Sequence, residues 1–161
     1  MSLQKKILIL GAGQAGAYAA SEIRKYDKES QITIFSEESY LPYERPPLSK
    51  ECIIGKKNFE KLSFFSKSFY EVENINIKYQ AVEKVNFEKK ILITNDNQNH
   101  NYDSLLIATG SKNRQLSYDK ENQDIKDNIL YLRDIEDSKK IKNIIESHNR
   151  FAIIGGGFIG L

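Results

Sequence analysis

Apolar residues occur along this chain in short runs separated by a longer stretch with helical spacing, which indicates an α/β protein. Residues 6–10 and 31–35 are continuous apolar or β-branched runs, as expected for strands of a parallel sheet covered on both faces. Between them, residues 14–26 form an alanine-rich amphipathic segment that predicts a helix. Its expected apolar stripe consists of Ala15, Ala19, Ile23 and Tyr26.

The next part of the chain combines a proline-rich loop with a predicted β-meander. Residues 36–50 contain all three prolines, and we expect this loop to be extended and stiff because proline fixes φ. A short helix is predicted over residues 63–73. The strands expected after it span residues 75–80, 82–87, 91–94 and 104–108, with a polar turn at 95–101.

The last third of the chain begins with a polar, weakly periodic stretch. Residues 111–128 are interpreted as a linker. A helix is predicted over residues 135–147, with Asp134 as its N-cap. The apolar run 151–154 is expected to be a strand that opens a second βαβ unit.

The same glycine spacing occurs twice, each time after an apolar run. The glycines are Gly11, Gly13 and Gly16 in the first copy, and Gly155, Gly157 and Gly160 in the second. In this fingerprint the first glycine allows a tight turn, the second lets the backbone approach phosphate oxygens, and the third lets helix and strand pack closely. The pattern predicts a nucleotide pyrophosphate at a helix N-terminus, and by itself it does not separate FAD from NAD.

An acidic residue lies at the spacing that the fingerprint requires. Glu37 or its neighbour Glu38 follows the second predicted strand, roughly 20 residues beyond the glycines. A carboxylate there accepts hydrogen bonds from ribose hydroxyls, and we take Glu37 as the first candidate.

Composition excludes several classes of function. The 161 residues carry a formal net charge of +2, which favours neither nucleic acid nor an anionic membrane as a partner. No apolar run approaches the roughly 20 residues needed to cross a bilayer. Cys52 is the only cysteine, so an internal disulfide and a cysteine-based metal site are excluded, and we expect no metal. The expected location is the cytoplasm.

The proline loop carries a specific family resemblance. Residues 41–50, Leu-Pro-Tyr-Glu-Arg-Pro-Pro-Leu-Ser-Lys, resemble the signature loop of FAD-dependent ferredoxin and rubredoxin reductases. These putidaredoxin-reductase-like enzymes belong to the class I pyridine nucleotide-disulfide oxidoreductase superfamily. The likeness continues in Ala108-Thr109-Gly110, in Leu132-Arg133-Asp134 and in both glycine motifs. The chain is therefore similar to an N-terminal fragment of such a reductase.

The resemblance implies a fold and a domain boundary. The fold is a Rossmann-like FAD-binding parallel sheet with an inserted β-meander, followed by the truncated start of a second Rossmann-like domain. Residues 1–112 would be the first segment of the FAD-binding domain. Residues 113–161 would be a linker and the beginning of the domain that binds the nicotinamide nucleotide.

The resemblance also assigns roles to residues. The FAD pyrophosphate would be held by Gly11, Gly13, Ala15 and Gly16, and the nicotinamide-nucleotide cradle would begin with Gly155, Gly157 and Gly160. Glu37 would bind the adenosine ribose, and Val82 would contact the adenine through its backbone. Arg45 would lie against the adenine end and the phosphates. Further cofactor contacts would come from Thr109, Gly110 and Arg133. Lys50 would be the catalytic residue, beside the flavin near N5, where a cation favours the anionic reduced flavin.

The implied activity is electron transfer from NAD(P)H through FAD to an iron-sulfur protein such as a ferredoxin or rubredoxin. Cys52 has no second cysteine to exchange with, so thiol chemistry is not expected and Cys52 is interpreted as a packing residue. The alternatives are an NADH oxidase or nitrite-reductase-like flavoprotein, or a non-catalytic module of the apoptosis-inducing-factor type. A further alternative is an inert fragment that pairs as a homodimer through an exposed sheet edge. Alone, the chain is expected to hold FAD weakly and not to oxidise NAD(P)H.

Overall fold

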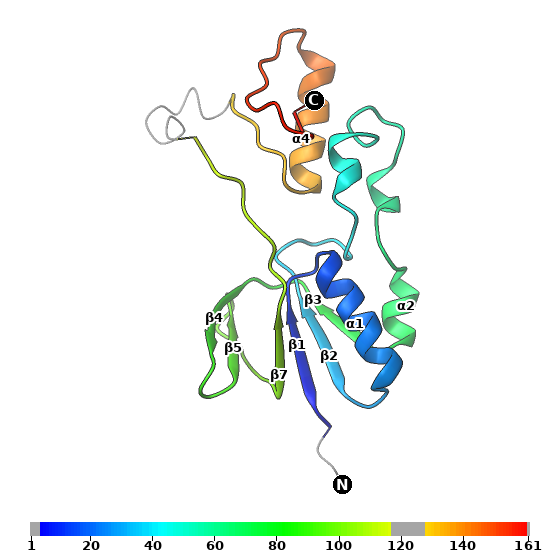
Figure 1. The fold of residues 1–161 in the computed structure, drawn as a ribbon, viewed down its shortest axis with the longest axis vertical. Coiled ribbons are helices and arrows are strands. Elements are labelled where there is room, and N and C mark those ends of the chain that lie inside the picture. The colour runs from blue at the N-terminus through cyan, green and yellow to red at the C-terminus, as the bar shows by residue number, and fades with distance from the viewer. Residues whose placement is uncertain (1–3, 117–127, 161) are drawn as a thin grey trace. The chain divides into compact units, whose positions relative to one another are not determined.

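The computed structural model of the chain describes residues 4–116 and 128–160 (Figure 1). The chain divides into two compact units that are not simple halves of the sequence. The first unit contains the described residues up to Glu44 together with 63–110. The second contains residues 45–62 and the described residues from 111 onward. The segment that follows the middle of the proline loop is therefore packed with residues more than 60 positions further along the chain.

A four-stranded parallel sheet forms the centre of the first unit. Its strand order is β3-β2-β1-β7, and all three strand pairings are parallel. The strands are β1 (Lys6–Leu10), β2 (Gln31–Phe35), β3 (Ile75–Lys78) and β7 (Ser104–Ile107). Helix α1 (Gln14–Tyr26) connects β1 to β2, and the short helix α2 (Lys67–Val72) precedes β3. These elements confirm the predicted α/β class, although α2 is shorter than the helix predicted over residues 63–73.

An antiparallel meander is inserted between β3 and β7. It consists of β4 (Val82–Asn86), β5 (Ile91–Thr94) and β6 (Asn99–Asn101). The prediction of a polar turn over residues 95–101 was wrong for residues 99–101, which pair with Ile91–Ile93, whereas residues 95–98 form the turn. These three asparagine and histidine residues have no strand propensity, and cross-strand hydrogen bonding to β5 decides their conformation.

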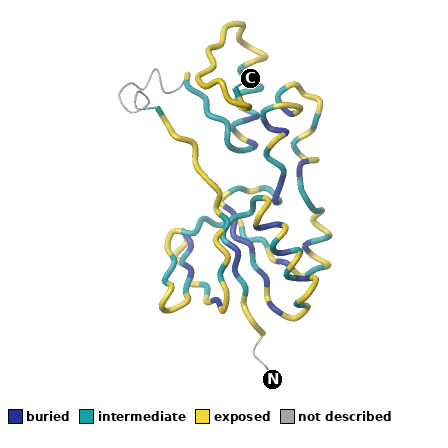
Figure 2. The backbone as a smooth tube through the Cα atoms, in the orientation of Figure 1, coloured by how far each residue is buried: buried dark blue, intermediate teal, exposed yellow. Residues whose placement is uncertain are grey.

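The two faces of the sheet are covered by different layers, as the alternation of side chains along a strand requires. On one face, Ile9, Ile32, Ile34 and Ile75 pack against Ala20 of α1 and Tyr70 of α2. On the other face, Leu8 and Phe35 pack with Leu92 and Tyr102 of the meander region. Figure 2 shows that the buried residues concentrate along β1 and β2.

The buried face of α1 agrees with the predicted stripe only in part: Ala19 and Ile23 pack against the core, whereas Ala15 is exposed. Ala17 and Ala20 are fully buried, whereas Tyr26 is 89% exposed. Arg24 is also buried, so the side of the helix that faces the protein interior includes position 24 and leaves position 26 in solvent. The small residues Gly16, Ala17 and Ala20 let α1 lie close to the sheet, so a bulky aromatic residue is not needed on this face.

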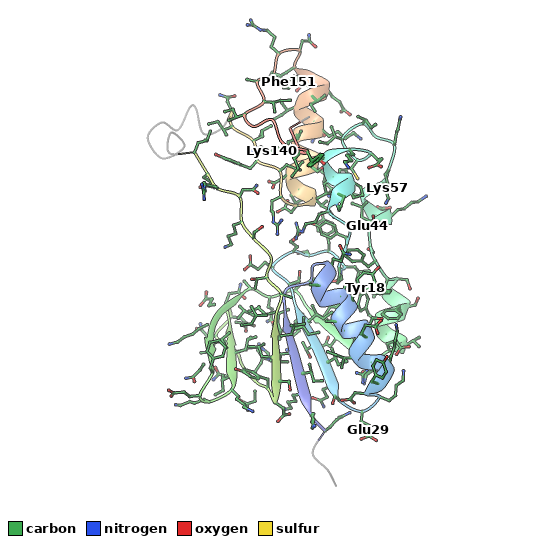
Figure 3. The ribbon with its side chains drawn as sticks, viewed as in Figure 1. Tyr18, Glu29, Glu44, Lys57, Lys140 and Phe151 are labelled. Carbon is green, nitrogen blue, oxygen red and sulfur yellow. The ribbon has the colours of Figure 1, made fainter. Side chains whose placement is uncertain are left out.

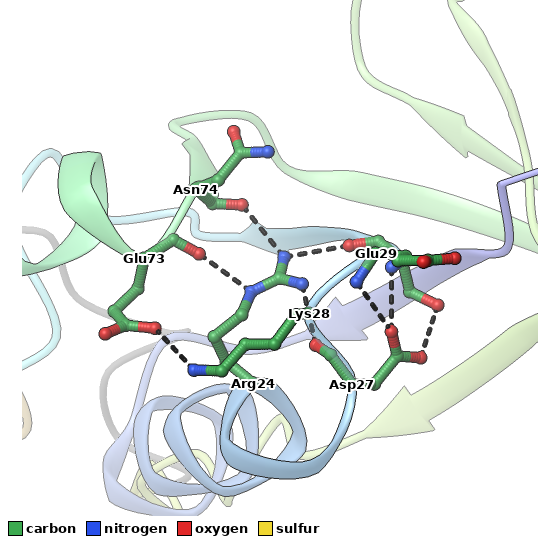
Figure 4. A network of polar contacts seen from close by, with 7 residues as sticks. Arg24, Asp27, Lys28, Glu29, Glu73 and Asn74 are labelled. Atoms are coloured by element: carbon green, nitrogen blue, oxygen red, sulfur yellow. Dashed lines mark hydrogen bonds and ion pairs between the residues drawn. The ribbon is translucent and has the colours of Figure 1, made fainter.

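Arg24 connects the ends of α1 and α2 (Figure 4). Its guanidinium donates hydrogen bonds of 2.7–3.1 Å to the backbone carbonyls of Glu73, Asp27, Ser30 and Asn74. The carbonyl ends of two helices carry partial negative charge, so a cation is favourable there. Asp27 accepts from the amide and hydroxyl of Ser30, and these bonds lower the pKa of the Asp27 carboxyl.

The second unit consists of the 3-10 turns η1 (Pro46–Ser49) and η2 (Phe59–Lys61) and the helix α4 (Ile135–Ser147). Its small core contains Leu48, Cys52, Leu62, Ile135 and Ser138, all at most 2% exposed. Burial of Cys52 agrees with its predicted packing role. Asp134 caps α4 as predicted, and Asp137 completes a capping box.

The expectation of an extended proline loop was wrong for residues 46–49. Pro46 and Pro47 occupy the first two positions of η1. Proline is well tolerated there, because the first amides of a helix have no acceptor within it and the fixed φ of proline matches helical geometry. The prolines therefore start a helical turn in this loop.

The strand predicted over residues 151–154 is not formed. These residues have no strand partner within the described ranges, and Ile153 and Ile154 are 71% and 76% exposed. Part of the predicted linker, residues 117–127, lies outside the described residues, as does Leu161. In the part of the chain that is described, no helix is long and apolar enough to cross a membrane.

Candidate nucleotide-binding site

The first glycine loop begins where β1 ends and is fitted tightly against β7. Gly11 has a φ of +113°, and its amide donates a 3.0 Å hydrogen bond to the carbonyl of Phe35 at the end of β2. A β-carbon added to Gly11 would lie 2.3 Å from the carbonyl oxygen of Ala108. Both the backbone angle and the available space therefore require glycine at this position.

Gly16 lets the first turn of α1 return over the loop. A β-carbon on Gly16 would lie 2.1 Å from the carbonyl oxygen of Gly11 and 3.2 Å from the side chain of Ile9. The third glycine of the motif therefore permits the close helix–strand contact that the sequence predicted.

Gly13 is the N-cap of α1 and faces open space. No heavy atom lies within 4 Å of a β-carbon placed on Gly13. No side chain caps the helix at this end, and its first turn, which includes Ala15, contains no acidic residue. The first amides of a helix need an acceptor, and its dipole favours an anion there. The loop thus fits a diphosphate, which would supply the missing acceptors and charge.

The two candidate carboxylates after β2, Glu37 and Glu38, differ in their hydrogen bonding. Glu38 accepts a hydrogen bond from the hydroxyl of Tyr43, and its backbone is tied to the Ser36 side chain. Glu37 is exposed, and its carboxylate has no hydrogen bond or ion pair within the described ranges. Glu37 is therefore the carboxylate that is available to a ligand.

Two further predicted residues lie beside the first loop. The amide of Ala108 donates to the carbonyl of Leu10 at 2.8 Å, which brings the end of β7 to the end of β1. Thr109 and Gly110 follow directly and are exposed, and Gly110 has a φ of +70°. The Ala108 carbonyl that closes on Gly11 was not predicted, because a backbone contact leaves no side-chain signal in the sequence.

Val82 starts the meander and is a core residue at the side-chain level. It pairs with Thr94 and packs against the cluster of Leu8, Phe35, Leu92 and Tyr102. Nearby, the ring of His100 meets the edge of Phe35 at a centroid distance of 5.0 Å. Burial, and then the charge of Lys78, lower the pKa of His100.

The remaining predicted residues belong to the second unit. Arg45 is the N-cap of η1, and its guanidinium donates a 2.6 Å hydrogen bond to the carbonyl of Arg133. The amide of Arg133 donates to the carboxylate of Asp137 at 2.7 Å. Lys50 ends η1 and is exposed. The structure thus brings Arg45 and Arg133 together, and it does not place either of them or Lys50 relative to the first loop.

The second glycine loop reproduces the internal geometry of the first. Gly155 has a φ of +110°, and a β-carbon on Gly160 would lie 2.0 Å from the carbonyl oxygen of Gly155 and 3.3 Å from the side chain of Ile153. Space is open around Gly155 and Gly157, where an added β-carbon would meet nothing within 4 Å. Phe151, labelled in Figure 3, belongs to the exposed run that leads into this loop.

A parallel sheet with a glycine turn and an uncapped helix at the end of its first strand is the arrangement by which α/β proteins of the Rossmann type bind nucleotides. Residues 5–161 match the pyridine nucleotide-disulphide oxidoreductase family, and the chain belongs to this family. Proteins of the family are generally FAD-dependent oxidoreductases of NAD(P)H. Among the residues that the structure describes, no group of three histidine, cysteine or acidic side chains is arranged to hold a metal ion.

The chain is similar over its length to known reductases. It is 34% identical to a probable ferredoxin reductase of Castellaniella defragrans, covering 100% of this chain and 39% of the relative. It is 33% identical to a rubredoxin-NAD(+) reductase of Pseudomonas putida, covering 96% and 40%. The crystal structure of a covalent putidaredoxin reductase–putidaredoxin complex matches with a TM-score of 0.90 and 32% identity, covering 98% of this chain and 38% of that chain. The chain therefore spans about two fifths of the length of these relatives.

Proposed function

We propose that this chain is the N-terminal, FAD-holding part of an NAD(P)H-dependent oxidoreductase that reduces a ferredoxin or rubredoxin. The carrying observation is the first glycine loop, where Gly13 opens onto empty space at the uncapped start of α1. The proposed FAD-binding segment is residues 1–112, and residues 113–161 begin the nicotinamide-nucleotide domain. One alternative from the sequence, an NADH oxidase or nitrite-reductase-like flavoprotein, differs from this proposal in the electron acceptor. The other, a non-catalytic module of the apoptosis-inducing-factor type, would bind flavin without catalysing the reduction of an acceptor.

The residues of the first unit would hold the diphosphate and adenosine parts of FAD. Backbone amides at Gly13, Ala15 and Gly16 would donate to the diphosphate, with Gly11 shaping the turn. Glu37 would accept from ribose hydroxyls, and Val82, Thr109 and Gly110 would line the cofactor with backbone. FAD, when bound, accepts a hydride as a pair of electrons and returns the electrons singly to a one-electron acceptor.

The second unit would supply cations. We propose that the ammonium group of Lys50 stabilises negative charge on the flavin ring. A positive charge held in place does this better than water, which must reorient around the new charge. Arg45 would lie against the adenine end and the phosphates, and Arg133 would also reach the cofactor. One donor of Arg45 already bonds the carbonyl of Arg133, so its other guanidinium donors would contact FAD. Gly155, Gly157 and Gly160 would begin the cradle for NAD(P)H.

FAD binding can be tested against FMN, which lacks the adenosine half. Titration of the purified chain, followed by quenching of flavin fluorescence, should give saturable binding of FAD and much weaker binding of FMN. The substitution Glu37→Gln should reduce FAD affinity about tenfold, since it removes a charged acceptor from the ribose. Glu29→Gln is the matched control, because Glu29 is exposed just before β2 and not after it.

Two results would overturn the proposed cofactor. One is the absence of saturable FAD binding, and the other is equal affinity for FAD and FMN. The acceptor is tested separately by joining this chain to the complementary part of a related reductase. NADH-dependent reduction of a ferredoxin or rubredoxin supports the proposal, whereas electron transfer to oxygen alone supports the oxidase alternative. The chain by itself should show no NADH turnover, because residues 151–154, which lead into its second loop, are exposed and pair with no strand in the described part of the chain.

A further inference from the structure

The turn that carries Lys50 is held at both ends by the start of α4. At its first end, the guanidinium of Arg45 donates to the carbonyl of Arg133, directly before the N-cap of α4. At its last end, the hydroxyl of Ser138 donates a 2.7 Å hydrogen bond to the carbonyl of Leu48. Both contacts lie within the second unit and join residues about 90 positions apart in the sequence.

The Ser138 contact is the one that a substitution can isolate. Ser138 is fully buried, and Leu48 is 2% exposed, so water does not reach this bond. The last carbonyls of a helical turn have no amide donor within the turn and need a donor from outside it. Removing the hydroxyl would leave the Leu48 carbonyl buried without a partner, which is costly.

The backbone just beyond this bond carries Lys50. The amides of Lys50 and Cys52 both donate to the carbonyl of Pro47 at 3.1 Å, and Lys50 itself has the unusual backbone angles φ −131° and ψ −104°. Cys52 is fully buried and fixes the chain on the far side of Lys50. Lys50 therefore belongs to a short segment that is flanked on both sides by residues buried in the core, Leu48 and Cys52.

We propose that Ser138 is a positioning residue for Lys50, acting through the carbonyl of Leu48. This proposal rests on the proposed function, in which the Lys50 ammonium lies beside the flavin. Nothing in the sequence indicates Ser138, because a serine in the second turn of a helix ordinarily faces water. Its role follows from burial and from the contact with η1.

The first test measures the turn and does not depend on flavin. In Ser138→Ala, the amide protons of Lys50 and Cys52 should exchange with solvent about tenfold faster or more, because the turn loses its buried tether. Ser147→Ala is the matched control: Ser147 lies on the same helix and is exposed, and its hydroxyl bonds to the carbonyls of Asn143 and Ile144 and to the ring Nδ1 of the adjacent His148. Unchanged exchange at Lys50 and Cys52 in Ser138→Ala would overturn the proposal.

The second test asks whether Ser138 acts through Lys50. With the chain saturated with FAD, the flavin reduction potential is measured in Ser138→Ala, Lys50→Ala and the double variant. The expected result is a shift in Ser138→Ala that disappears when Lys50 is already alanine, since coupled residues are not additive. Equal shifts in both backgrounds would mean a merely structural effect and would overturn the positioning role. Ser138→Cys, of similar size and with a weaker donor, should lie between wild type and Ser138→Ala and guards against a folding defect.

The two hypotheses fail in different ways. If Lys50→Ala leaves the flavin potential unchanged while exchange at Lys50 still responds to Ser138→Ala, the proposed role of Lys50 is wrong and the tether itself stands. If Lys50→Ala shifts the potential and Ser138→Ala does not, the proposed function survives and Ser138 has no positioning role.

Discussion

The first glycine loop, residues 11–16, and the second, residues 155–160, turn the backbone in the same way. Their first glycines have φ angles of +113° and +110°, and their third glycines approach the first carbonyl equally closely. Their surroundings differ. Ile9, before the first loop, is fully buried in a strand paired on both sides, whereas Ile153 is 71% exposed.

This difference separates two requirements of a nucleotide site. The shape of the turn is a local property, because it recurs at residues 155–160, where no described strand pairs with the run that precedes the loop. The first loop in addition lies between a strand that is paired on both sides and the helix α1, which together hold its amides in place. The comparison explains why we assign FAD binding to the first loop and expect no NAD(P)H turnover from the second.

The sharpest way to break the comparison is to add one methyl group to each loop. Gly11→Ala should lower the free energy of unfolding by about 3 to 4 kcal/mol, because the β-carbon meets the Ala108 carbonyl at 2.3 Å and the backbone angle is strained. Gly155→Ala shares the angle and lacks the neighbour, so about 1 kcal/mol is expected. Urea unfolding followed by circular dichroism measures both, and equal losses would contradict the argument.

The next largest expected effect on stability comes from Arg24, whose guanidinium anchors helix α1 behind the first loop. Arg24→Ala should lower the free energy of unfolding by about 2 to 3 kcal/mol, because it removes the donors of the buried Ser30 carbonyl and of three partly buried carbonyls. Lys25→Ala, the control on the neighbouring position, removes only an exposed pair with Glu22 and should change stability little. A similar loss in both variants would mean that the buried network is not what holds α1.

Gly13→Ala tests ligand binding with little effect on folding. A β-carbon at Gly13 enters space that is empty of protein atoms and that the diphosphate would occupy. FAD affinity should fall about tenfold, or ~1.4 kcal/mol, while the free energy of unfolding changes by less than about 1 kcal/mol. Gly157→Ala, at the same place in the second loop, should leave FAD affinity unchanged. An equal loss of FAD affinity in the two variants would remove the distinction between the loops.

The smallest effect concerns pH. His100 packs on Phe35, whose carbonyl accepts from Gly11, and burial and Lys78 lower the pKa of His100 while Asp96 opposes them. A histidine with a lowered pKa in the folded state favours the neutral form, so its contribution is complete above about pH 6.5 and is lost as pH falls below that value. The pH dependence of the urea midpoint should flatten in His100→Asn. If the urea midpoint of His100→Asn depends on pH as steeply as that of the unmodified chain, His100 packed on Phe35 does not contribute to the pH dependence of stability.

Much of the secondary structure was predictable because the sequence patterns that specify it involve residues only a few positions apart. The bounds of β1, α1 and β2 follow from apolar runs and a glycine turn, and Asp134 identifies the start of α4. The glycine spacing predicted the loop shape in both copies. The predicted polar turn failed for residues 99–101 because β6 is held by pairing with β5. The predicted strand at 151–154 failed because no described segment pairs with it.

The amino-acid sequence by itself determined the two glycine turns, the principal helices and strands, and the family to which the chain belongs, since these depend on residues a few positions apart. Only the tertiary structure decided that Glu37 and not Glu38 is available, that Arg24 is buried while Tyr26 is exposed, and that α4 holds the turn carrying Lys50. The physical reason is that hydrogen-bond partners and burial come from segments tens of residues away, and no local pattern records which carbonyl a buried serine or arginine will meet.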